Sequence, residues 1–259
     1  MKTKTFTIVV AIAFFLVCRA RATLNWDIYS DAMIQEPDIY NIVSIYDTPP
    51  NHTTVTMVGG GVDVMYPYDS TTLNVTGGNV ATVGAMGSST VNISGEAQIR
   101  SIGVGEWSTV NISGGGIEDV TARSYGTLNM SGGSVEGSVD VRDFGMLNMT
   151  GGEMSRLSVA EKAVVNLSGG LITEGIVGAR RWFFETDVTI NFYGYDLVKT
   201  SSGGKYGAGQ IYGFYPDGSQ FTVDIGGISH TCIKLIPEPS TILLLALGGL
   251  AVRMREQRI

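Results

Sequence analysis

One six-residue phrase recurs through the middle of the chain at a nearly constant interval. It reads VNISGG at residues 110–115, LNMSGG at 128–133 and LNMTGG at 147–152. Aligned on its asparagine, the phrase repeats after 18, 19, 18, 19 and 18 residues. A period of about 20 residues without a helical pattern predicts a solenoid, a rod of stacked coils. The aligned positions are Asn74, Asn92, Asn111, Asn129, Asn148 and Asn166, with Thr56 one step before them and Asn191 a longer step after them.

Apolar and polar residues alternate around each asparagine. Both neighbours of the asparagine are apolar in every repeat, and the residues beyond them are mostly Thr and Ser. This two-residue period predicts a strand with one buried face. Three further apolar columns stand at nearly fixed distances from the asparagine. They are Val83, Ile102, Val120, Val139 and Leu157; then Ala85, Val104, Ala122, Val141 and Val159; then Val80, Ile99, Ile117, Val135, Met154 and Ile172.

These patterns predict an all-β fold, a single-stranded parallel β-helix of seven to eight coils with 18–19 residues each. Glycine corners would join two or three short strands per coil, and each strand would pair with its equivalent in the next coil about 4.8 Å away. The open strand edges at the ends of a rod need covers. We therefore expect an N-terminal cap at 23–53, coils at 54–181 and a C-terminal β cap at 182–235, with a hairpin at Asp217-Gly218.

The first residues have the features of an export signal. Lys2 and Lys4 precede an apolar run, and a small-x-small triplet ends at Ala22. This order predicts a signal peptide at 1–22 that signal peptidase cleaves between Ala22 and Thr23. The alternatives are an uncleaved membrane anchor, for which the apolar run is short, and a lipoprotein anchor through Cys18. Cleavage leaves Cys232 as the only cysteine, so no internal disulfide is expected.

The last residues carry a second signal. Pro237-Glu238-Pro239 is followed by an apolar run at 242–252 and by three arginines within 253–259. In this order, residues 236–259 resemble a PEP-CTERM sorting signal with a short transmembrane helix. The resemblance implies that a membrane exosortase reads the motif, that the helix holds the chain in the inner membrane transiently, and that the host secretes polysaccharide or forms a biofilm. Glu256 and Gln257 interrupt the arginine cluster usual for the family.

Processing at both ends makes the product strongly acidic. The formal net charge of the chain is −7, and removing residues 1–22 and 253–259 lowers it to −13. A surface with this charge excludes nucleic acid as a partner. Divalent cations and cationic polymers are more suitable contacts.

Several residues in the repeats have side chains suited to binding or catalysis. Six of the asparagines form Asn-x-Ser/Thr, but their close stacking favours an outward ladder of hydrogen-bonded amides over glycan sites. Trp107, Tyr125 and Phe144 form an aromatic column that either shields the core or binds sugar rings. Asp143 and Glu161 on adjacent rungs have the spacing of a glycosidase pair, although the arginines at 123 and 142 favour an ion-pair network. The two histidines, His52 and His230, lie outside the repeats, and no pattern indicates catalytic residues, a metal site or a cofactor.

The sequence therefore predicts an exported, non-enzymatic protein of the cell surface or biofilm matrix, structural or adhesive in role. Its expected partners are signal peptidase and an exosortase during export, with an extracellular polysaccharide as the candidate afterwards. Two alternatives remain. One is a polysaccharide-degrading β-helix enzyme, a lyase or glycoside hydrolase. The other is a lattice-binding protein whose repeated Thr, Asn and Ser columns match ice or a crystalline polymer.

Overall fold

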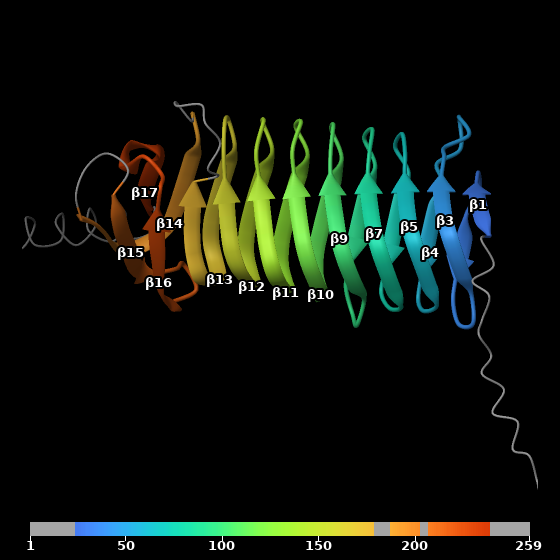
Figure 1. The fold of residues 1–259 in the computed structure, drawn as a ribbon, viewed down its shortest axis with the longest axis horizontal. Coiled ribbons are helices and arrows are strands. Elements are labelled where there is room, and N and C mark those ends of the chain that lie inside the picture. Colours follow the sequence, from blue (N-terminus) through green and yellow to red (C-terminus); the bar gives the residue numbers. More distant parts are fainter. Residues whose placement is uncertain (1–23, 179–186, 203–206, 239–259) are drawn as a thin grey trace, which may run out of the picture.

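The computed structural model describes residues 24–178, 187–202 and 207–238, which form an elongated rod of stacked coils (Figure 1). The predicted signal peptide, with Ala22 and Thr23, lies outside the described residues. So do Pro239 and the rest of the predicted transmembrane helix. Within the described ranges, no helix is long and apolar enough to cross a membrane.

Each coil contributes one rung to two parallel strand columns. In the first four coils a shorter and a longer strand are separate, and in the next four they merge into one continuous strand. The described residues thus form eight coils, within the seven to eight that the spacing predicted. The shorter strands are β2 (Ala32–Ile34), β4 (Thr54–Met57), β6 (Thr72–Val75) and β8 (Thr90–Ile93). The longer strands are β3 (Ile39–Ile45), β5 (Gly61–Pro67), β7 (Asn79–Ala85) and β9 (Gln98–Val104). The merged strands are β10 (Thr109–Ala122), β11 (Thr127–Val141), β12 (Met146–Val159) and β13 (Val164–Gly178).

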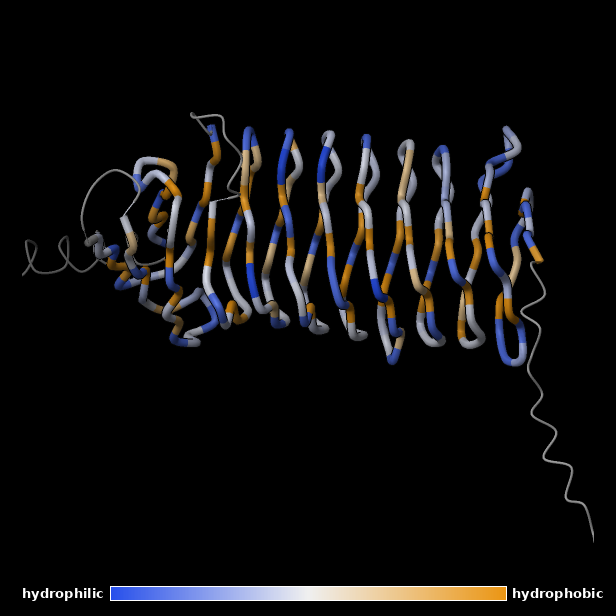
Figure 2. The backbone as a smooth tube through the Cα atoms, viewed as in Figure 1, coloured by the Kyte–Doolittle hydropathy of each residue, from blue (hydrophilic) through white to orange (hydrophobic). Residues whose placement is uncertain are grey.

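The core is a set of apolar columns that run along the rod. The residues on either side of each aligned asparagine are buried, and so are the three further columns that the sequence predicted. Strand pairing keeps like residues together, so that Val120 faces Ile102 in one neighbouring coil and Val139 in the other. Along each strand the tube alternates between hydrophobic and hydrophilic residues (Figure 2). The two-residue period therefore fixes which side chains point inward.

The corner after each asparagine-bearing strand uses paired glycines. The second glycine adopts a positive φ in most coils, for example 84° at Gly115 and 76° at Gly133. A Cβ at Gly133 would lie 2.7 Å from the carbonyl oxygen of Gly114 in the preceding coil. Both the conformation and the close approach of the two corners exclude a side chain here, which explains why the phrase ends in Gly-Gly.

The N-terminal segment, for which the sequence predicted a cap at 23–53, contributes the first strands of the solenoid. Strand β1 (Asn25–Ile28) pairs in parallel with β3, β2 pairs with β4, and β3 pairs with β5. Met33 lies opposite Thr56, at the position that asparagine takes in later coils. The aromatic residues that suggested a cap stack along the edge of the rod instead. Tyr46 lies between Tyr29 and Tyr68, with ring centroids 5.3 and 5.0 Å away.

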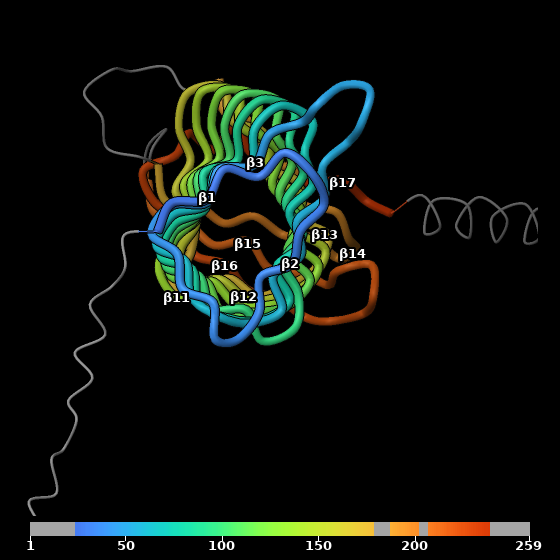
Figure 3. Tube along the Cα trace, turned by 90° about the vertical axis from the view of Figure 1, so that its right-hand side faces the viewer, coloured from blue at the N-terminus to red at the C-terminus, as the bar shows by residue number. Residues whose placement is uncertain are grey.

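The C-terminal end changes from parallel to antiparallel pairing. The first half of β14 (Thr189–Ser202) continues the shorter-strand column, and Asn191 lies opposite Asn166. Its second half pairs with β15 (Ala208–Phe214), which forms an antiparallel hairpin with β16 (Gln220–Gly226) around the predicted Asp217-Gly218 turn. These strands lie across the far end of the coils when the rod is viewed along its axis (Figure 3). After a short 3-10 helix, η1 (His230–Cys232), strand β17 (Ile233–Pro237) stacks on β14 as the last parallel rung.

Candidate functional site

The aligned asparagines form one hydrogen-bonded ladder along the rod. From Asn92 to Asn191, each Nδ2 donates to the Oδ1 of the asparagine one coil earlier, at 2.8 Å in every step. The side chains are half-buried, because each amide lies between two others. All of these bonds run in the same direction, so each asparagine between Asn74 and Asn191 both donates and accepts within the ladder. This arrangement gives the six predicted positions a structural role.

The hydroxyl groups beside the ladder are also used inside the rod. The Oγ atoms of Ser113 and Ser131 donate to the carbonyl oxygens of Ile93 and Ile112 in the preceding coil, at 3.2 and 3.4 Å. The Asn-x-Ser motifs therefore contribute both of their polar side chains to contacts between coils. The donor capacity of these hydroxyls is therefore used between coils, while their oxygens keep acceptor lone pairs.

The three aromatic residues of the predicted column stack face to face at the turn that precedes the ladder strands. Ring centroids are 4.5 Å apart for Trp107 and Tyr125, and 4.7 Å apart for Tyr125 and Phe144, with planes within 12° of parallel. Lys162 Nζ lies 5.0 Å from the centroid of Phe144 and continues the column as a cation. The exposed fractions are 67% for Trp107, 46% for Tyr125 and 44% for Phe144. The stack is thus displayed to solvent, and it does not cover the core in the way that shielding requires.

The backbone of these turns is strained where it presents the rings. Glu106 has a φ of 52°, Ser124 and Tyr125 have 51° and 69°, and Asp143 and Phe144 have 53° and 145°. Side chains other than glycine are unfavourable in this region, at a cost of about 1–3 kcal/mol per residue. The preceding coil uses Gly87 at the equivalent place, with a φ of 65°. Asp69 and Glu161 have the same conformation in coils where the next residue is Ser70 or Lys162, so the strain is a property of the turn. The case for binding by the aromatic column rests on the exposure of its rings.

The charged residues beside the stack form local contacts rather than one continuous network. Arg142 Nε lies 3.6 Å from Asp140 Oδ2, while Glu161 Oε2 accepts a hydrogen bond of 3.1 Å from the backbone N–H of Asp143. A side-chain hydrogen bond with Asp143, desolvation and the negative charge of Asp143 raise the pKa of Glu161. Both carboxylates lie on the exposed turn, where water screens their interaction. The two carboxylates lie close together, as in an acid–base pair, but they lie outside the groove described below.

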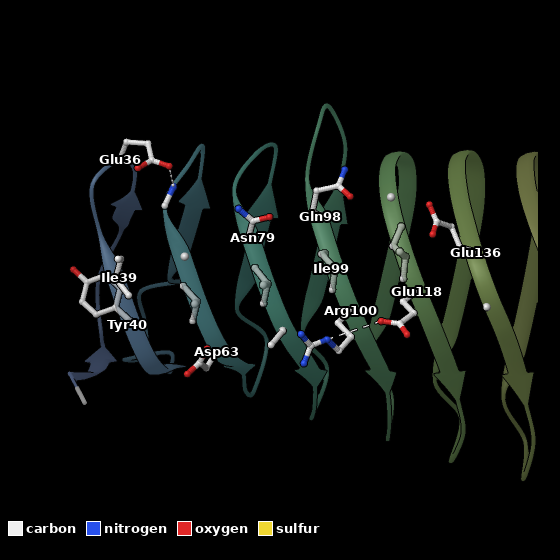
Figure 4. A pocket seen from close by; sticks show the side chains of 18 residues that line it. Glu36, Ile39, Tyr40, Asp63, Asn79, Gln98, Ile99, Arg100, Glu118 and Glu136 are labelled. Atoms are coloured by element: carbon white, nitrogen blue, oxygen red, sulfur yellow. Dashed lines mark hydrogen bonds and ion pairs between the residues drawn. The ribbon is translucent and has the colours of Figure 1, made fainter. Parts of the chain in front are cut away.

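A shallow groove with a volume of about 960 Å³ follows the longer-strand column on another face of the rod (Figure 4). Its floor is formed by the buried Val62, Val80, Ile99 and Ile117. Outward side chains form the two rims, with Glu36, Asn79 and Gln98 along one and Asp63, Arg100 and Glu118 along the other. The groove crosses several coils and suits an extended ligand better than a compact one.

The groove carries more negative than positive charge. Four carboxylates line it, against a single arginine, and Arg100 Nε lies 3.9 Å from Glu118 Oε2 with both side chains exposed. Sequence reasoning missed these residues because it considered the polar positions before the asparagine. The sequence feature that could have identified them is the polar residue directly after each buried residue of this column. Asp63 follows Val62, Arg100 follows Ile99, and Glu118 follows Ile117. Among the described residues, no group of three or more His, Cys, Asp or Glu side chains is placed to hold a metal ion.

The predicted sorting motif begins on the last strand of the rod. Pro237 ends β17 opposite Gly194, and the backbone N–H of Glu238 donates to the carbonyl oxygen of Gly194 at 3.0 Å. Pro237 is exposed and Glu238 half-buried. The motif therefore starts where the chain leaves the folded cap, without a long linker between the two.

The two histidines occupy separate places in the fold. His52 Nδ1 lies 3.7 Å from Asp47 Oδ2, and its Nε2 shares a hydrogen bond of 2.9 Å with Thr72 Oγ1. His230 lies in η1 at the other end of the rod, with its Nε2 3.2 Å from the carbonyl oxygen of Gly207. Neither histidine lies in the groove or in the aromatic stack.

Comparison with protein families identifies the C-terminal signal. Residues 235–258 match the family model of the PEP-CTERM protein-sorting motif, in agreement with the resemblance of the tail. The motif implies an exported protein that an exosortase processes. No curated protein and no solved structure matches the chain.

Proposed function

We propose that this chain is a non-enzymatic rod of the cell surface or extracellular matrix, structural or adhesive in role, which an exosortase sorts to that location. The observation that carries the proposal is the combination of an unbroken asparagine ladder with a sorting motif at the end of the last strand. The ladder extends from Asn74 to Asn191, on the first strand of the C-terminal cap, so hydrogen bonds join the coils to the cap. A sorted rod of this kind serves as a rigid element outside the cell.

The position of the motif supports delivery of an intact rod. Strand β17 is paired with β14 up to Pro237, so a cut beyond the motif leaves every described strand in place. The apolar run at 242–252 is then available to hold the precursor at the membrane while the rod folds outside. We infer that the inner membrane anchors the chain only until this cut is made.

The distribution of ionisable groups supports a role without chemistry. An active site needs several convergent groups that water cannot freely screen. Here the groove carboxylates are spread along the rod, and the Asp143–Glu161 pair lies on an exposed turn. The polar ladder columns are devoted to contacts between coils.

Terminal processing tests the sorting part of the proposal. In the native host, the mature protein should begin at Thr23 and lack the arginine-bearing residues 253–259, because signal peptidase and the exosortase each remove one end. Mass spectrometry of the termini of protein recovered from the cell surface measures this. A Pro237→Ala, Pro239→Ala double variant should retain the C-terminal segment and remain in the membrane fraction. Recovery of wild-type surface protein with an intact arginine tail would contradict the proposal.

The hydrogen bond between Glu161 and Asp143, with the raised pKa of Glu161, is the observation that favours the alternative, a polysaccharide-degrading enzyme. If the rod does no chemistry, incubation of the purified protein with acidic and neutral polysaccharides should release no new reducing ends and no unsaturated products. Asp143→Asn and Glu161→Gln should then leave the polymers equally intact. Chain cleavage by the wild type that either variant abolishes would establish the enzyme instead.

A further inference from the structure

The aromatic stack has one covered end and one open end. The inner faces of Trp107, Tyr125 and Phe144 are occupied by one another, and Lys162 covers the outer side of Phe144. At the other end, the only ring that contacts Trp107 among the described residues is Tyr125. The position of Trp107 in the preceding coil is taken by Ser88, which is exposed and small. One face of the indole ring is therefore open to solvent.

The open face extends over more than one coil. Ser70 takes the equivalent position one coil before Ser88 and is also exposed. Since coils stack about 4.8 Å apart, two successive serines leave room for a ring, or two rings, to continue the stack. Beyond Ser70, the loop between β3 and β4 projects outside the outline of the other coils (Figure 3). His52 in this loop hydrogen-bonds Thr72, so the loop lies beside the free positions and bounds them.

Polar groups surround the free positions at the edge of the indole ring. Glu106 precedes Trp107, and its Oε2 accepts a hydrogen bond of 2.6 Å from the backbone N–H of Gly87 in the preceding coil. The carboxylate thus extends toward the preceding coil, where its lone pairs can accept further hydrogen bonds. Ser88 offers a hydroxyl from the same rung. On the next rung, Ser70 Oγ donates to Asp47.

We propose that the open face of Trp107 binds a pyranose ring of a polysaccharide, which stacks on the indole as the next member of the aromatic column. The apolar C–H face of an equatorially substituted sugar packs on the indole, and the hydroxyls at its edge bond to Glu106 and Ser88. This inference deepens the proposed function by naming a ligand class, and it rests on that function for the setting in which such a polymer is met. The ring plane is then perpendicular to the rod axis, so the polymer crosses the rod.

This geometry makes binding local to one end of the stack. Tyr125 has a ring on each side and has no free face to offer. A cationic ligand is the competing occupant, because an indole face next to a carboxylate also attracts an ammonium group. The Ser88 hydroxyl favours a neutral polyhydroxyl ring, because such a ring contacts the indole face, the Glu106 carboxylate and this hydroxyl at once.

The test compares three variants of the full chain by isothermal titration with cellohexaose, mannohexaose and benzyltrimethylammonium. Trp107→Ala should weaken cellohexaose binding at least about tenfold, since it removes the central aromatic anchor. Ser88→Phe should weaken it similarly while leaving the melting temperature unchanged or higher, because the added ring fills the slot and extends the stack. Tyr125→Leu is the matched control and should change affinity by less than about threefold, since this ring contributes no open face.

Each outcome decides the proposal. The proposal is supported if Trp107→Ala and Ser88→Phe both lose hexasaccharide binding while Tyr125→Leu retains it. It is overturned if the wild type binds neither hexasaccharide, if Ser88→Phe binds as the wild type does, or if the cation alone binds. These measurements use purified protein, so their failure would leave the terminal processing and the sorting proposal unaffected.

Discussion

Val120→Asp should unfold the rod locally or prevent it from folding, with a loss of at least about 3 kcal/mol in the free energy of unfolding. Val120 is 1% exposed and lies between Ile102 and Val139 in a continuous apolar column. A carboxylate here has apolar neighbours above and below, so it is buried unpaired or is forced to take up a proton. Thermal and urea melts followed by circular dichroism measure the change.

Asn129→Ser is the comparison at an outward-facing ladder position in the next coil. It breaks two ladder bonds, the one donated to Asn111 and the one accepted from Asn148. At about 0.5–1.5 kcal/mol for each hydrogen bond, the expected cost is roughly 1–3 kcal/mol, below that of Val120→Asp. A larger loss for Asn129→Ser than for Val120→Asp would contradict the assignment of inner and outer faces.

The second large effect is expected at a glycine corner. Gly133→Ala should destabilise the rod by roughly 2–4 kcal/mol, from backbone strain together with steric overlap. Gly133 has a φ of 76°, and a Cβ there meets only backbone atoms of the preceding corner, at 2.7, 2.9 and 3.0 Å. Because coils stack at every rung, the corner cannot move outward without breaking the pairing beside it.

Gly103→Ala provides the control for this corner. Gly103 lies in strand β9 with an ordinary φ, and the nearest atom to an added Cβ is the carbonyl oxygen of Val83 at 3.9 Å. The change should be neutral, or stabilising by up to about 1 kcal/mol, since alanine restricts the unfolded chain. Equal losses for Gly103→Ala and Gly133→Ala in chemical denaturation would show that the corner geometry is not the cause.

The repeat made most of the rod predictable. The period of 18–19 residues and the alternation around Asn111 or Asn129 specified the strands, the buried columns and the ladder, because all three depend on local patterns that recur. Spacing alone places Val83, Ile102 and Val120 in one column, and these residues pair in this way. The hairpin at Asp217-Gly218 could also be predicted from a local pattern, because a turn-forming pair lies between two apolar runs.

Two features escaped the sequence because they depend on contacts between coils. The first coil lacks the phrase, and Met33 in place of asparagine concealed that residues 25–45 pair as an ordinary coil. The groove also escaped, because its rims combine residues from different coils, such as Asn79, Arg100 and Glu118, whose alignment follows from the register after the corner. The repeat period shows which residues stack in one column, but it does not show that two columns enclose a groove.

Strand pairing also determines how the rod responds to tension along its axis. The coils are connected in series, so every junction carries the whole load and the weakest one yields first. Neighbouring merged strands share ten or eleven paired positions, whereas β13 shares four with β14 and two with β16. A pull on the C-terminal tail therefore peels away the cap while the eight coils remain folded. The junction at β13 therefore separates before the coils do, and it limits the force that a load on the C-terminal end transmits to the rod.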